Sequence, residues 1–164
     1  TRYDLADFLK ACCFGHTSLN FRCRSDMTMK LGFLGAGQMG SAIAVGAVRN
    51  DIVSAANICF CDPVSEQLMN ASRLVPGCRT LSQPNELFEF ADVVVLAVKP
   101  QVMPVVAKQV ASLLTDGHTV VSIAAGISLQ KLKSWFNKGK LIRVMPNTPA
   151  QIGLGASAIA SDLS

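Results

Sequence analysis

Three glycines at fixed spacing are the residues of this sequence best suited to holding a phosphorylated ligand. The segment Gly35-Ala36-Gly37-Gln38-Met39-Gly40 has the pattern G-x-G-x-x-G, directly after an apolar run and directly before a segment with helical periodicity. In that context Gly35 permits the tight turn, Gly37 lets the backbone approach a pyrophosphate, and Gly40 lets the helix pack closely. The free N–H groups at the helix start would bind the pyrophosphate. The segment predicts a dinucleotide-binding loop; the alternative is a glycine-rich turn without a ligand.

An acidic side chain follows the next apolar run. Asp62 lies roughly 20 residues after the loop, where a dinucleotide-binding fold places the residue that meets the adenosine ribose. Its carboxylate would accept hydrogen bonds from both ribose hydroxyls of NAD and would repel the 2′-phosphate of NADP, and no Arg or Lys follows within ten residues to offset it. Asp62 therefore favours NAD. The alternative, which can coexist with ribose binding, is that Asp62 caps a helix beginning at Pro63.

Apolar runs and segments with the i, i+3, i+4 spacing of helices alternate from Met29 onward. Nearly continuous apolar strands separated by helices predict an α/β fold with a Rossmann-type, doubly wound and mostly parallel sheet. The expected strands are Lys30–Leu34, Asn57–Cys61, a weak Arg79–Leu81, Asp92–Val98, Thr119–Ala124 and Leu141–Met145, and the expected helices are Gln38–Arg49, Val64–Leu74, Gln83–Phe90, Gln101–Leu114 and Ser128–Asn137.

Small and polar residues follow the later strands. One strand ends in Ala97-Val98-Lys99-Pro100 and the next in Ala124-Ala125-Gly126, where small side chains would let a cofactor lie flat across the strand ends. Lys99 would either bond to the ligand or simply be solvated. After the last strand, the prolines of Pro146-Asn147-Thr148-Pro149 stiffen a loop that presents two polar side chains, unless that loop is only a structural turn.

Composition excludes several classes of protein. The 164 residues are 50% apolar and 16% charged, which indicates one folded domain rather than a disordered chain. A net charge of +4 spread along the chain and only 6% aromatics predict no nucleic-acid partner. The apolar runs are far shorter than the roughly 20 residues that cross a bilayer, so no membrane association is expected.

Few other residues suggest chemistry. The six cysteines lack zinc-ligand spacing, so we expect no metal; Cys59 and Cys61 should pack together on one strand face, and free thiols favour a cytoplasmic location. His118 is expected at the surface, and Trp135 is expected to pack. The lysines near Trp135 suit a solvated face. With no Ser/His/Asp or Cys/His set in view, we predict no catalytic side chain.

Residues 1–28 do not continue the alternating pattern. They show no secretory signal, and Asp4, Asp7 and Asp26 are unusual in a transit peptide. We therefore expect an extension or leader of unclear origin over residues 1–28, followed by one dinucleotide-binding domain over residues 29–164.

Four motifs in order, Gly32–Gly40, Ala97–Pro100, Val120–Gly126 and Arg143–Pro149, resemble the amino-terminal domain of the pyrroline-5-carboxylate reductase family. The resemblance implies hydride transfer from NAD(P)H to the imine of 1-pyrroline-5-carboxylate, which gives L-proline. It also implies a homo-oligomer built by a helical carboxyl-terminal domain, which we expect to be absent here, so that this chain alone would lack turnover. Family members often use NADPH and carry Ser, Thr or Asn in place of Asp62.

The resemblance also assigns residues. Asn147 and Thr148 would lie near the reacting ring, and Asn85 is close to the position of a family asparagine that touches the cofactor. The cofactor-binding residues would be Leu34, Gly35, Ala36, Gly37, Gln38, Met39, Gly40, Asp62, Asn85, Ala97, Val98, Lys99, Pro100, Ala124, Ala125 and Gly126. Two alternatives stay open: a dinucleotide-binding module without catalysis, and a β-hydroxyacid-type dehydrogenase, whose usual lysine this chain does not contain.

Overall fold

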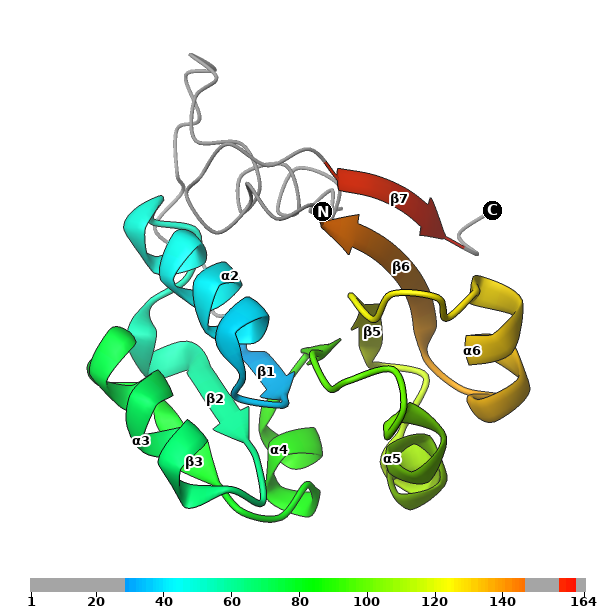
Figure 1. The fold of residues 1–164 in the computed structure, drawn as a ribbon, viewed down its shortest axis with the longest axis horizontal. Coiled ribbons are helices and arrows are strands. Elements are labelled where there is room, and N and C mark those ends of the chain that lie inside the picture. Colours follow the sequence, from blue (N-terminus) through cyan, green and yellow to red (C-terminus); the bar gives the residue numbers. More distant parts are fainter. Residues whose placement is uncertain (1–28, 147–156, 162–164) are drawn as a thin grey trace.

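The computed structural model describes residues 29–146 and 157–161, and these form a sheet with helices on both faces (Figure 1). The strand order is β3-β2-β1-β4-β5-β6-β7; β1 to β6 are parallel, and β7 pairs antiparallel with β6. Asn147 and Thr148, which are predicted to lie near the reacting ring, are outside the described residues. The elements are β1 (Leu31–Leu34), α2 (Gln38–Arg49), the 3-10 helix η1 (Ala55–Asn57), β2 (Ile58–Cys61), α3 (Ser65–Leu74), β3 (Arg79–Leu81), α4 (Asn85–Phe90), β4 (Val93–Leu96), α5 (Met103–Val110), the 3-10 helix η2 (Ala111–Leu113), β5 (Thr119–Ser122), α6 (Leu129–Trp135), β6 (Lys140–Pro146) and β7 (Ser157–Ser161).

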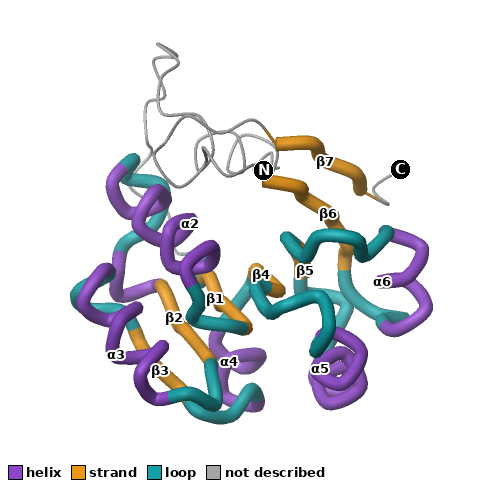
Figure 2. The backbone as a smooth tube through the Cα atoms, in the orientation of Figure 1, coloured by secondary structure: helices purple, strands orange, loops and turns teal. Residues whose placement is uncertain are grey.

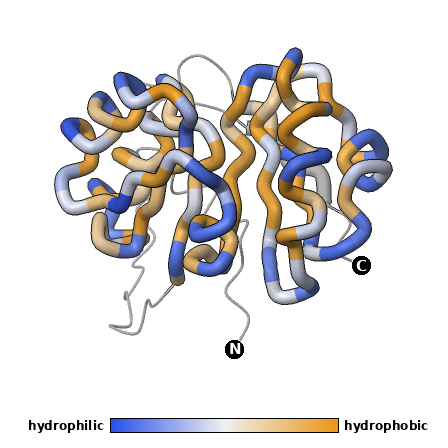
Figure 3. Tube along the Cα trace, turned by 90° about the horizontal axis from the view of Figure 1, so that it is seen from below, coloured by the Kyte–Doolittle hydropathy of each residue, from blue (hydrophilic) through white to orange (hydrophobic). Residues whose placement is uncertain are grey.

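Alternate residues of each buried strand supply two separate cores. Phe33 and Phe60 stack with ring centroids 5.0 Å apart on the face that α2 and α3 cover. Cys59 and Cys61 point to the opposite face, which α4, α5 and α6 cover, so their expected packing on one side is confirmed. The two layers of helices flank the strands in Figure 2, and the hydrophobic residues follow the interior strands in Figure 3. The interior strands β1, β2 and β4 are therefore buried on both faces, as parallel strands require.

The doubly wound topology predicted from the sequence is confirmed, and most element bounds differ only at their ends. The helix expected over Gln101–Leu114 divides into α5 and η2, and it begins at Met103. Pro104 lies in the first turn of α5, where its missing N–H costs no helical hydrogen bond. Strand β7 was not predicted, because its Ser157–Ser161 segment is short and rich in small residues. No helix in the described ranges is long and apolar enough to span a membrane.

His118 is buried, so its predicted surface position is wrong. The Thr115 backbone N–H donates to Nδ1 at 2.9 Å, which requires that Nδ1 bear no proton. The other ring nitrogen, Nε2, therefore carries the proton and donates to the Phe88 carbonyl at 2.9 Å. The imidazole also packs edge-on against the Phe88 ring. His118 thus joins α4 to the turn before β5, which is a structural role.

Replacing this histidine tests that role. We expect His118→Leu to lower the free energy of unfolding by about 1–3 kcal/mol, because the Phe88 carbonyl and the Thr115 N–H lose their shared partner. Urea unfolding measures the change, with Lys138→Gln as the control at an exposed position nearby. An unchanged midpoint in His118→Leu would contradict the assignment.

Candidate functional site

The loop after β1 turns sharply against the end of β4. Gly35 has φ +105°, and its N–H donates to the Cys61 carbonyl at 2.8 Å. A Cβ on Gly35 would lie 2.7 Å from the Ala97 carbonyl oxygen, which is backbone and cannot move aside easily. Only glycine fits at this position, which agrees with the tight turn predicted from the spacing.

Helix α2 begins from this loop with an uncovered end. Gly37 is its N-cap, no side chain caps it, and no acidic residue lies in its first turn. Among the described residues, a Cβ on Gly37 would meet nothing within 4 Å, whereas one on Gly40 would lie 3.0 Å from the Ala97 Cβ. The helix start therefore touches the strands at Gly40 and faces open space at Gly37. Its N–H groups, which lack helical acceptors, and its positive dipole end suit an anion.

Asp62 holds the loop from the neighbouring strand. Its Oδ2 accepts a hydrogen bond from the Ala36 N–H at 2.9 Å, and its Oδ1 accepts one from the Val64 N–H at 2.9 Å. The alternative that Asp62 caps a helix beginning at Pro63 is wrong, because α3 begins at Ser65 and Val64 is its N-cap. The carboxylate instead connects the glycine loop to the turn that leads into α3.

The ends of β1, β4 and β5 form one continuous edge beside this loop. The Ala97 N–H donates to the Leu34 carbonyl at 2.8 Å, and the Ile123 N–H donates to the Leu96 carbonyl at 3.3 Å. Ala125 and Gly126 follow on the exposed side, and Lys99 is exposed. The glycine loop, Ala97–Pro100 and Ala124–Gly126 therefore lie along the same edge, as the sequence predicted.

Arg143 lies beside this edge, and the sequence predicted no role for it. It lies opposite Ser122 in the register of β5 and β6. Its Nε–H donates to the Ile127 carbonyl at 2.6 Å, directly after the Ala124–Gly126 segment. In the sequence, Arg143 is marked only by its place at the start of the last motif. That motif does not show which carbonyl the side chain reaches.

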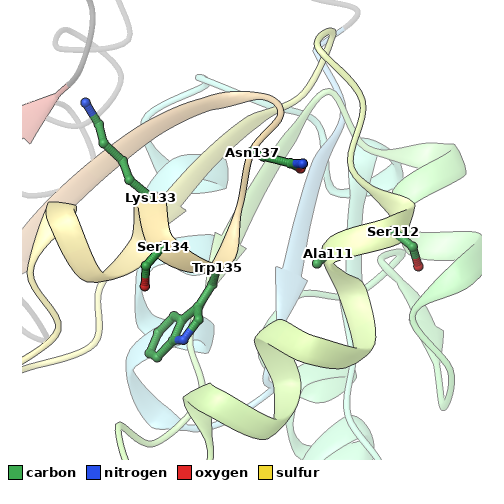
Figure 4. A pocket seen from close by; sticks show the side chains of 6 residues that line it. All are labelled: Ala111, Ser112, Lys133, Ser134, Trp135 and Asn137. Carbon is green, nitrogen blue, oxygen red and sulfur yellow. The ribbon is translucent and has the colours of Figure 1, made fainter.

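Asn85 is not joined to this edge by any hydrogen bond that the structure shows within the described residues. It begins α4, is exposed, and lines a hollow of about 440 Å³ with Phe88 and His118. A second open hollow, of about 360 Å³, lies between η2 and the end of α6, and Lys133, Trp135 and Asn137 are among the residues that line it (Figure 4). Neither hollow contains a residue of the glycine loop.

The thiols of Cys59 and Cys61, on the strand next to the loop, are unreactive near neutral pH. Burial raises the pKa of Cys59 to about 12, with a further increase from the nearby Cys61. Burial also raises the pKa of Cys61 to about 11, and the Asp62 carboxylate adds to the increase. Both groups therefore stay protonated near neutral pH, and a protonated thiol is neither a good nucleophile nor a metal ligand. Among the described residues beside the loop, the backbone N–H groups and Asp62 are better suited to binding than these thiols.

Comparison with known proteins identifies the fold's family. Residues 30–126, more than half of the chain, match the family profile described as "NADP oxidoreductase coenzyme F420-dependent". The chain belongs to this family. Its relatives include pyrroline-5-carboxylate reductases from Pisum sativum, 38% identical over 130 residues, and from Vibrio alginolyticus, 41% identical over 131 residues. The family resemblance stated from the four motifs is therefore confirmed.

The match to these reductases is partial in length. The chain spans about half the length of the curated relatives it matches: each alignment covers 79% of this chain and 47% of the relative. A crystal structure of Plasmodium falciparum pyrroline carboxylate reductase with NADP bound has a TM-score of 0.71 and 31% identity, over 82% of this chain and 48% of that one. The part of the reductase family to which this chain corresponds is thus the dinucleotide-binding fold.

Proposed function

We propose that this protein is the dinucleotide-binding part of a pyrroline-5-carboxylate reductase. The reaction is hydride transfer from NAD(P)H to the imine carbon of 1-pyrroline-5-carboxylate, which gives L-proline. The observation that carries the proposal is the uncovered start of α2 at Gly37, between β1 and β4. Strand order reverses direction between these two strands, and open α/β sheets bind dinucleotides in the crevice at that point.

The chain's own groups fit such a cofactor. A pyrophosphate fits the helix start, where no described residue lies within 4 Å of a Cβ built on Gly37. With the phosphates there, the adenosine would lie towards Asp62 on the β2 side, and the nicotinamide would lie towards Ala97–Pro100 and Ala124–Gly126. When bound, the cofactor supplies the hydride; the protein binds and orients it, and small residues at the edge leave room for the ring. Asn85, Asn147 and Thr148 remain proposed contacts by resemblance alone.

The preference between NAD and NADP is a finer proposal. The Asp62 carboxylate lies within hydrogen-bonding distance of the loop and would face a 2′-phosphate with a like charge. This favours NAD, although a related reductase has been crystallised with NADP.

We further propose a homo-oligomeric reductase in the cytoplasm, without a nucleic-acid or membrane partner, as the family resemblance and the free thiols suggest.

Cofactor binding by the chain tests the proposal directly. NADH and NADPH are titrated against the protein, and Trp135, the one tryptophan of the sequence, reports binding by energy transfer to the reduced nicotinamide. Gly37→Val is expected to fold normally, because its side chain enters open space, but to lose detectable binding by blocking the pyrophosphate. Gly117→Val, at a glycine near the opposite edge, serves as the matched control. Undiminished binding by Gly37→Val would place the cofactor elsewhere.

A second measurement addresses Asp62. Asp62→Ser and Asp62→Asn both remove the negative charge, and we expect the ratio of NADH to NADPH affinity to fall by about tenfold in each. Asn keeps an oxygen that accepts from the Ala36 N–H, so it controls for loss of the loop contact. If both ratios equal the wild-type ratio, Asp62 does not meet the ribose end.

The reaction itself is tested in a chimera. Residues 29–164 replace the matching half of the Pisum sativum reductase, and proline formation is measured with 1-pyrroline-5-carboxylate and either reduced cofactor. We expect turnover, and we expect the same chimera carrying Gly37→Val to be inactive. A chimera that binds cofactor but forms no proline would favour a dinucleotide-binding module over a reductase.

A further inference from the structure

The Arg143 side chain connects β6 to the segment that follows β5, beyond the last backbone pairing of the two strands at Ser122 and Arg143. The side chain starts on β6 and reaches the main chain after β5, where Nε–H donates to the Ile127 carbonyl at 2.6 Å. Nη2 lies 3.5 Å from the Met145 Sδ on the same strand. The arginine is partly buried, so water competes less for the donor, and hydrogen bonds from a charged donor are roughly twice as strong as neutral ones.

Within the described residues, the segment that Arg143 reaches has few other hydrogen bonds, although Ala124 and Ile127 pack against the core under α4, α5 and α6. Residues 123–128 lie between β5 and α6 without regular structure, and Gly126 has φ +74° with nothing within 4 Å of its Cβ position. The Ala124 N–H donates to the Ser122 hydroxyl across a long 3.5 Å distance. Within the described part of the chain, Arg143 supplies the hydrogen bond that the structure shows from another strand to the main chain of residues 124–127.

This segment lies on the side of the edge where a nicotinamide would bind. If the pyrophosphate occupies the start of α2 and the adenosine lies over β2, the other end of the dinucleotide extends over β4 and β5. We infer that Arg143 is a positioning residue, which fixes the 124–127 segment through the Ile127 carbonyl and so shapes the surface that receives the nicotinamide half. The inference rests on the proposed function and extends it to a residue outside the glycine loop.

Two substitutions separate the hydrogen bond from the bulk of the side chain. Glutamine carries an N–H donor at the same number of bonds from Cα as the arginine Nε, whereas methionine carries a methyl group there. Arg143→Gln therefore keeps a donor for the Ile127 carbonyl, and Arg143→Met fills similar space without one. Lys140→Met, at the exposed first residue of β6, is the control for removing a positive charge.

The readout compares NADH with ADP-ribose, which has the same adenosine and phosphates but no nicotinamide. The ratio of the two dissociation constants measures how much the nicotinamide contributes to affinity. The same ratio is measured for NADPH and ADP-ribose 2′-phosphate. For Arg143→Met we expect that contribution to fall by about five- to tenfold while ADP-ribose affinity stays unchanged. For Arg143→Gln and Lys140→Met we expect the wild-type ratio. The melting temperature of each variant is measured to confirm that it folds.

Each other result overturns the inference. Equal losses in Arg143→Met and Arg143→Gln would mean that the charge, not the Nε–H donor, is required. A parallel loss of ADP-ribose affinity would indicate a general structural role, and an unchanged ratio in Arg143→Met would show that the segment needs no fixing. A wild-type protein that binds NADH no more tightly than ADP-ribose would also overturn it, while leaving the dinucleotide site intact. Binding of neither ligand would instead contradict the proposed function itself.

Discussion

Direct contact between the start of α2 and the ends of β1 and β4 is the constraint on which the rest of the binding edge depends. The contact is possible because positions 35 and 40 carry no side chain: a Cβ at Gly35 would lie 2.7 Å from the Ala97 oxygen, and one at Gly40 would lie 3.0 Å from the Ala97 Cβ. A side chain at either position would separate the helix from the strands. The first N–H groups of α2 would then no longer emerge at the sheet edge.

Two side chains of opposite charge, Asp62 and Arg143, hold the two loops at this edge. One accepts a hydrogen bond from its loop and the other donates one. Asp62, after β2, accepts a hydrogen bond from the loop that follows β1. Arg143, on β6, donates one to the segment that follows β5. Each side chain reaches from its own strand to the segment that follows a neighbouring strand. The parallel sheet brings these partners together, because neighbouring strands that run the same way deliver their following loops to one edge.

The sequence was sufficient wherever the deciding interactions were local. The bounds of α2 were predicted correctly because Gly37 and the helical periodicity mark its limits. Side-chain contacts between distant segments were not predictable: His118 looked like a surface residue beside a turn, and its burial depends on the Phe88 carbonyl, 30 residues away. Similarly, Asp62 was expected to contact a ligand or cap a helix, and nothing near it in the sequence indicated its bond to Ala36. Strand β7 depends on pairing with β6 rather than on its own composition.

The hydrogen bond between Asp62 and the Ala36 N–H also has an entropic consequence. A glycine-rich loop is expensive to order, because glycine has more backbone conformations to lose than any other residue. Here part of that ordering is already achieved by the folded protein, since the carboxylate fixes the residue between the first two glycines of the loop. Any anion that settles on the start of α2 therefore meets a loop with little conformational freedom left to lose, and more of its interaction energy remains as affinity.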